Sequence, residues 1–123
     1  MMQSLSSQTV AADSGCWITI CSVDAIAPNT GVSALVGTAQ IAVFRIGVTD
    51  EVYAIDNFDP FSQTFVMSRG LIGDRQGILK VASPIYKQNF NLKTGACLDD
   101  ATVNLPTYPA RVVEGQVQIQ TAE

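Results

Sequence analysis

Short alternating runs of apolar and polar residues, separated by glycine, proline and other turn-forming residues, recur along most of the chain. This pattern is typical of an all-β protein, because strands alternate with period two and are joined by tight turns. The first half predicts four strands, at residues 17–21, 31–36, 39–46 and 51–56, of which the last three form a meander. The third run is apolar at almost every position up to Arg45, as expected for a central strand covered on both faces.

The second half is less regular. Residues 57–77 contain one proline and three glycines and are predicted to form a long loop that covers the sheet or has a function. A strand at 77–82, a motif at 83–97, a connector at 101–109 and a terminal hairpin that turns at Gly115 follow. In that hairpin, Val117 and Ile119 are predicted to face one side and the glutamines the other. The sequence therefore predicts a small antiparallel β-sandwich or barrel with a two-loop subdomain.

Length and composition set the limits of the fold. A chain of 123 residues with 47% hydrophobic and 15% charged residues is typical of one globular domain. Residues 1–15 are small and polar and lack the features of a secretory signal, so we expect a disordered tail there and a single domain over residues 16–121. Since no apolar run approaches the ~20 residues of a membrane span, we expect no membrane partner.

Charge and residue usage exclude several classes of function. The net charge is −4 and the seven basic residues are scattered, whereas nucleic-acid binding needs a concentrated basic surface. The sequence has no histidine, which removes the commonest metal ligand and the commonest general base. Cys16, Cys21 and Cys97 are predicted to be small buried thiols, because no CxxC spacing occurs and no histidine could activate them. We therefore predict no catalytic residue in this chain.

Two loops carry the most distinctive pattern. The first lies in DNFDPFS, residues 56–62, and the second begins SPIYKQNFNLKTGAC, residues 83–97. The pair resembles Rieske-type proteins, in which Cys-x-His and Cys-x-x-His loops hold a two-iron, two-sulfur cluster and the second loop continues as Phe-x-Leu-x-Thr-Gly-x-Cys. That continuation is reproduced from Phe90 to Cys97. The resemblance extends from Trp17 to Ile119 and implies a Rieske-like iron–sulfur protein fold.

The four ligand positions of that pattern fall on Asp59, Phe61, Ser83 and Tyr86, and none of these is a Rieske ligand. Hard oxygen atoms match iron–sulfur chemistry poorly, and Phe61 offers no donor. The sequence therefore predicts a Rieske-like domain without the cluster and without another cofactor. We expect Phe61 and Tyr86 to fill the space of the cluster by packing. We expect Asp59 and Ser83, each followed by proline, to shape the turns.

The strings D-N-x-D-P-F-S and S-P-x-Y-K-Q-x-F-x-L-x-T-G-x-C resemble one group without the cluster, the small subunits of assimilatory NAD(P)H-dependent nitrite reductase. The resemblance implies a cytoplasmic subunit with no catalytic site of its own. It also implies a large subunit that carries FAD, sirohaem and an iron–sulfur cluster and reduces nitrite to ammonium. We expect the loops to contact that subunit through Asp59, Phe61, Phe65, Tyr86 and Lys87.

Two other classes of function stay open. One is a Rieske-type, ferredoxin-like electron carrier or an interaction module of another oxidoreductase, against which the replaced ligands argue. The other is an autonomous enzyme, for which the chain supplies neither histidine, an activated thiol nor a paired acid in an apolar setting. Asp99 and Asp100 could suggest a carboxylate metal site, but two adjacent carboxylates without further ligands are more typical of a solvated turn.

Overall fold

The structure, a computed structural model, describes residues 16–121. Within this range the chain forms strands and two short 3-10 helices, η1 (Val23–Ala25) and η2 (Met67–Arg69), and no α-helix. This confirms the all-β prediction. The expected disordered tail at residues 1–15 lies outside the described residues. No helix in the described range is long and apolar enough to cross a membrane.

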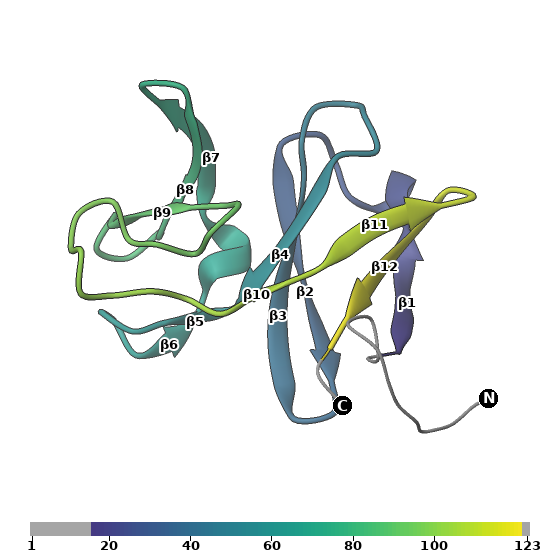
Figure 1. Cartoon of the computed structure of the whole chain (residues 1–123), viewed down its shortest axis with the longest axis horizontal. Coiled ribbons are helices and arrows are strands. Elements are labelled where there is room, and N and C mark those ends of the chain that lie inside the picture. The colour runs from purple at the N-terminus through teal and green to yellow at the C-terminus, as the bar shows by residue number, and fades with distance from the viewer. Residues whose placement is uncertain (1–15, 122–123) are drawn as a thin grey trace.

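The strands form antiparallel sheets arranged in three layers (Figure 1). The first sheet consists, in spatial order, of β1 (Trp17–Ser22), β12 (Gln116–Gln120) and β11 (Ala110–Val113). The middle sheet consists of β10 (Thr107–Tyr108), β4 (Val52–Asp56), β3 (Ala39–Arg45) and β2 (Thr30–Val36). The third layer holds the hairpin of β5 (Phe58–Asp59) and β6 (Thr64–Phe65) and the sheet of β7 (Leu71–Arg75), β8 (Ile78–Ala82) and β9 (Asn89–Asn91).

The middle sheet separates two hydrophobic cores, and β3 contributes to both. Ile41 and Val43 are fully buried on one face, in a cluster with side chains of the first sheet such as Ile119. Ala42 and Phe44 are fully buried on the other face, in a cluster that includes residues of the third layer. Alternate residues of a strand point to opposite faces, so a strand between two cores needs a continuous apolar run. This confirms the prediction that residues 39–46 form a central strand.

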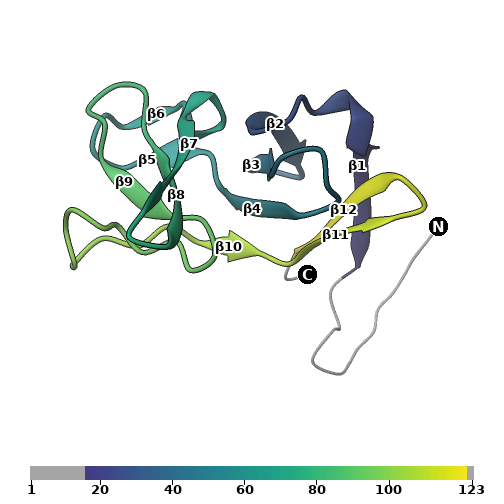
Figure 2. The same ribbon diagram turned by 90° about the horizontal axis from the view of Figure 1, so that it is seen from above.

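Most of the predicted strands are confirmed. Strands β2, β3 and β4 form the predicted meander with continuous antiparallel register. Strands β11 and β12 form the predicted terminal hairpin, and Val117 and Ile119 are both fully buried. Figure 2, viewed at right angles to Figure 1, shows the third layer on the opposite side of the middle sheet from β1, β11 and β12. The two loops of interest therefore belong to a subdomain at one end of the protein.

The prediction of one long loop over residues 57–77 was wrong. This segment contains the β5–β6 hairpin, η2 and all of β7, which pairs with β8 from Leu71↔Ala82 to Arg75↔Ile78. The cause is a two-residue turn at Gln76 and Gly77, whose φ angles are 53° and 85°. Two positive φ angles match the right-handed twist of a tight hairpin. The connector expected at 101–109 likewise contains β10, which pairs with β4.

Candidate functional site

The two loops that resemble the Rieske pattern meet at Asp59 and Ser83. Asp59 is the last residue of β5, and Ser83 follows directly after β8. Both side chains are buried, with 0% and 1% of their surfaces exposed. The Ser83 hydroxyl lies 2.5 Å from Oδ2 of Asp59 and donates a hydrogen bond to it. The two positions that carry cysteines in Rieske proteins are thus joined by a hydrogen bond.

Asp59 also shapes its own loop. Its Oδ1 accepts the backbone N–H of Phe61 at 2.9 Å, and its Oδ2 accepts the hydroxyl of Ser62 at 2.9 Å. The backbone N–H of Gln63 donates to the Asp59 carbonyl at 2.7 Å. These contacts confirm the turn predicted before Pro60, in which an aspartate side chain binds the backbone two residues on. Because Asp59 is buried, it shapes the loop from within instead of presenting its carboxyl group at the surface, where we expected it to contact a partner.

Ser83 closes the second loop. Its backbone N–H donates to the carbonyl of Gln88 at 2.9 Å, and its hydroxyl accepts the N–H of Ile85 at 3.4 Å. The predicted turn before Pro84 is therefore confirmed. Lys87 adopts a φ of 66° at the tip of the loop and is exposed, as predicted for a solvated residue. The short segment between Ser83 and Gln88 is a closed turn that presents its side chains outward.

The two positions that carry histidines in Rieske proteins differ from each other. Phe61 is half-buried, packs against the core of the third layer, and its ring centroid lies 6.1 Å from that of the fully buried Phe90. Tyr86, in contrast, is 62% exposed. The prediction that Tyr86 fills the space of the cluster was wrong, because the closed turn directs its ring away from the core. Of the two aromatic residues, only Phe61 contributes packing there.

The donor set of the two loops does not fit a Rieske cluster. Such a cluster needs two thiolates and two imidazoles, and the four positions offer a carboxyl group, a phenyl ring, a hydroxyl and an exposed phenol. The carboxyl and hydroxyl groups are already engaged with each other. Within residues 16–121, no three side chains of His, Cys, Asp or Glu gather as a candidate metal site.

The Asp99 and Asp100 pair is structural, as predicted. Asp99 accepts the backbone N–H of Asn89 at 2.7 Å and the guanidinium of Arg75 at 3.2 Å. The backbone hydrogen bond from Asn89 is the main reason why the pKa of Asp99 lies below its usual range. Asp100 accepts the backbone N–H and the hydroxyl of Thr102. These carboxylates secure the start of β9 and a turn.

The cysteines are only partly as predicted. Cys97 is buried in the core of the third layer, and Cys21 is half-buried, which raises the pKa of its thiol. Cys16 is exposed, so the prediction was wrong for this residue, which precedes the first sheet. All three are free thiols.

Sequence reasoning missed two residues of the site. Ser62 donates to Asp59 and lies 2.8 Å from the hydroxyl of Thr64, which links it to β6. Ile85 is 44% exposed beside Tyr86. The only sequence signal for either was its place next to a proline turn, where side chains are held at the surface of a loop.

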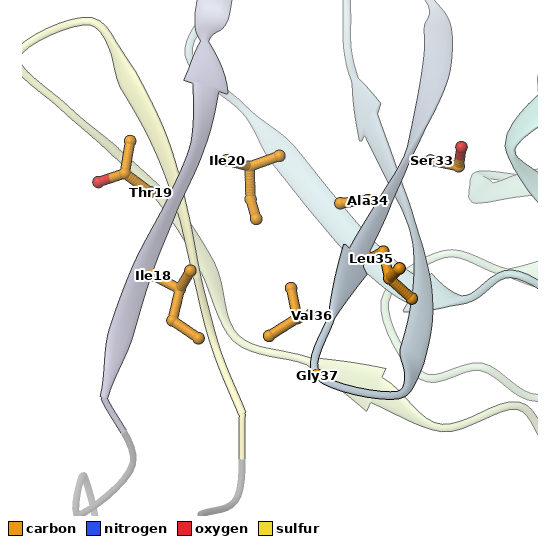
Figure 3. A pocket seen from close by; sticks show the side chains of 8 residues that line it. All are labelled: Ile18, Thr19, Ile20, Ser33, Ala34, Leu35, Val36 and Gly37. Atoms are coloured by element: carbon orange, nitrogen blue, oxygen red, sulfur yellow. The ribbon is translucent and has the colours of Figure 1, made fainter.

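A groove lies elsewhere, between the free edges of β1 and β2 (Figure 3). Its volume is about 440 Å³, and it is lined by Ile18, Thr19, Ile20, Ser33, Ala34, Leu35, Val36 and Gly37. In Figure 3, Ile20 and Val36 point into the space between the strands, whereas Leu35 points away. Ile20 and Val36 are partly buried and pack against the core between the first and middle sheets. The lining contains no charged side chain, and its polar side-chain groups are the hydroxyls of Thr19 and Ser33.

Known proteins share this fold and sequence. Residues 16–120 match the family of the Rieske-like [2Fe-2S] domain. The chain is 49% identical over 104 residues to the nitrite reductase (NADH) small subunit of Escherichia coli strain K12, which covers 85% of this chain and 96% of that protein. The solution structure of the Escherichia coli protein NirD superposes with a TM-score of 0.83 at 47% identity, covering 89% of this chain and 99% of that one.

A third relative has a different organisation. The nitrite reductase [NAD(P)H] large subunit of Klebsiella oxytoca is 43% identical over 103 residues, which are 84% of this chain and only 11% of that protein. These similarities cover nearly all of the described residues and include both loops. The chain belongs to the Rieske-like [2Fe-2S] domain family and, within it, to the nitrite reductase small subunits.

Proposed function

We propose that this chain is the small, non-catalytic subunit of an NAD(P)H-dependent nitrite reductase, with residues 16–121 as its single domain. It supports a large subunit that carries FAD, sirohaem and an iron–sulfur cluster and reduces nitrite to ammonium in cytoplasmic nitrate assimilation. The relatives named as nitrite reductase small subunits support the assignment. The side chains at the four ligand positions match an iron–sulfur cluster poorly, which supports a role without electron transfer through this chain.

One observation carries the proposal of a large-subunit partner. In Klebsiella oxytoca, a protein named as the large subunit contains a segment 43% identical to this chain within a single, much longer polypeptide. We infer that this domain, which occurs both as a separate chain and as part of a larger one, has the same neighbouring domains in both cases. Covalent attachment raises the effective concentration of such neighbours, and a separate subunit needs a binding surface instead.

We place this binding surface on the two loops of the third layer. Phe65 is 51% exposed and Tyr86 is 62% exposed, and Lys87 lies beside Tyr86 at the tip of the second loop. Phe61 is half-buried and supports the first loop from below. Exposed aromatic residues are frequent anchors of protein interfaces, since they bury a large area at a low entropic cost.

The test is reconstitution with the large subunit encoded by the same organism. The large subunit should retain this chain in a pull-down, and the pair should differ from the large subunit alone in stability or in nitrite-dependent oxidation of NAD(P)H. The chain alone should show no such oxidation. Phe65→Glu or Lys87→Glu should weaken binding about tenfold or more, because the first replaces an aromatic anchor by a charge and the second reverses a charge in the proposed contact. Gln116→Glu, at the exposed start of β12 beside the hairpin turn, is the matched control and should bind as the wild type does.

Two results would contradict these proposals in different ways. If the large subunit does not bind the wild-type chain and its turnover does not change, the assigned function is wrong. If it binds the Phe65, Lys87 and Gln116 variants equally well, the function stands and the contact surface lies elsewhere.

A further inference from the structure

A buried carboxyl group connects the two loops. One oxygen of Asp59, Oδ1, accepts the N–H of Phe61 from the first loop. The other, Oδ2, accepts two hydroxyls, that of Ser62 from the same loop at 2.9 Å and that of Ser83 from the second loop at 2.5 Å. Of these contacts only the one to Ser83 crosses between loops that lie 24 positions apart in the sequence.

Burial makes this contact selective for one arrangement of the loops. Asp59 is 0% exposed, and no Lys or Arg among the described residues forms an ion pair with it. A buried carboxyl group depends on donors, and leaving one of its oxygens without a donor is costly. Separation of the loops would remove the Ser83 donor. The loops are therefore held at one distance, because the Asp59 carboxyl group needs the hydrogen bond from Ser83.

The same two residues also anchor the exposed aromatic side chains. Asp59 pairs with Thr64 in the β5–β6 hairpin, and Phe65 follows with its ring centroid 5.1 Å from that of Phe58. Ser83 closes the turn that carries Tyr86 through the hydrogen bond from its N–H to the carbonyl of Gln88. A link between Asp59 and Ser83 therefore sets the placement of Phe65 relative to Tyr86.

We propose that Asp59 and Ser83 are positioning residues that replace the cluster as the cross-link between the loops and thereby pre-organise one docking surface for the large subunit. This inference rests on the proposed function. Loops that are already ordered lose less conformational entropy on binding, so the link contributes to affinity although neither side chain touches the partner.

Two serines provide a matched pair of variants. Ser83→Ala and Ser62→Ala each remove one hydroxyl from the same carboxyl oxygen, but only Ser83 links the two loops. The dissociation constant of the complex with the large subunit should rise about tenfold or more for Ser83→Ala, since loops that are no longer linked must be ordered on binding. It should change about threefold or less for Ser62→Ala. Hydrogen exchange should accelerate in both loops, at 58–65 and 83–90, in Ser83→Ala, and only in the first loop in Ser62→Ala.

A second series separates the link from general loss of structure. In an Asp59→Ala background, Ser83→Ala should weaken binding much less, because its contact with Asp59 is already gone and only the long contact with the N–H of Ile85 is left to lose. Asp59→Asn keeps the shape of the side chain and one acceptor, so its affinity should lie between those of the wild type and Asp59→Ala. This graded rescue is expected of a positioning residue. If Asp59→Ala does not fold, Asp59→Asn and the two serine variants still decide the matter.

The outcomes distinguish this proposal from the one on which it rests. If the wild type does not bind the large subunit, the proposed function fails. If the wild type binds and Ser83→Ala and Ser62→Ala bind equally well with equal exchange in the second loop, the function stands and the link has no positioning role. A selective loss in Ser83→Ala, much smaller in the Asp59→Ala background, establishes the link.

Discussion

In the loops of this protein, hydrogen bonds occupy the place of metal ligands. Asp59 and Ser83 stand at the positions that carry cysteines in Rieske proteins, and their side chains bind each other and the adjacent backbone. Hard oxygens match iron–sulfur chemistry poorly, but they still provide a cross-link here, because a carboxyl group accepts several donors at once. Phe61 adds packing against Phe90 beneath this link.

Tyr86 and Phe90 are expected to differ sharply in their effect on stability. Tyr86 is largely exposed and Phe90 is fully buried. Tyr86→Ala should change the free energy of unfolding by less than about 0.5 kcal/mol, as is usual for surface substitutions. Phe90→Ala should cost about 3–5 kcal/mol, because it removes buried surface and leaves a cavity. Denaturant unfolding of the two variants measures both, and a loss in Tyr86→Ala comparable to that in Phe90→Ala would show that the ring is enclosed after all.

The roles of Asp59 and Ser83 in turns could be predicted from the sequence, because each acts on residues two positions away and precedes a proline. The contact between them could not, since no local pattern reports a hydrogen bond between loops 24 positions apart. The outward direction of the Tyr86 side chain could not be predicted from the sequence either. It depends on the positive φ of Lys87 and on closure of the turn by Gln88, and neither is encoded in the ligand pattern.

Among the elements, strand β3 was predictable and β7 was not. The continuous apolar run of β3 has one interpretation, a strand between two cores. The β7 residues Leu71–Arg75 include a glycine and two charged residues and show no clear alternation. They form a strand because the turn at Gln76 and Gly77 brings them beside β8. The signal for that turn was a single glycine, which many other loop conformations also contain.

The terminal hairpin provides a test of this turn chemistry. Glu114 and Gly115 have φ angles of 52° and 77°, which is the same arrangement as at Gln76 and Gly77. Gly115→Ala should destabilise the fold by about 1–2 kcal/mol, because a Cβ atom is unfavourable in the left-handed region. Nothing lies within 4 Å of the added Cβ, so the cost is conformational and not a clash. Thermal unfolding measures the loss, with the exposed Gln116→Ala as a control expected within about 0.5 kcal/mol. Equal midpoints for the two variants would refute this account of the turn.

The protein as a whole combines a Rieske-like frame with two hydrophobic cores, one on each face of the middle sheet. The core of the third layer lies between the loops and the middle sheet, and its buried residues include Phe44, Met67, Phe90 and Leu92. Burial of these side chains contributes to the stability of the subdomain. A fold stabilised by ligation depends on its metal, whereas a fold stabilised by packing and by the Asp59–Ser83 hydrogen bond does not.

We therefore expect purification without oxygen to yield a colourless protein with no stoichiometric iron or acid-labile sulfide. A chelator should leave its unfolding midpoint unchanged, because no bound ion contributes to the free energy of unfolding. A Rieske ferredoxin taken through the same procedure is the control and should lose colour and stability under chelation. The chain must be measured apart from the large subunit, whose own cofactors would otherwise dominate the absorbance. A brown preparation with near-stoichiometric iron and sulfide, and a midpoint lowered by the chelator, would mean that oxygen ligands can hold a cluster in this frame after all.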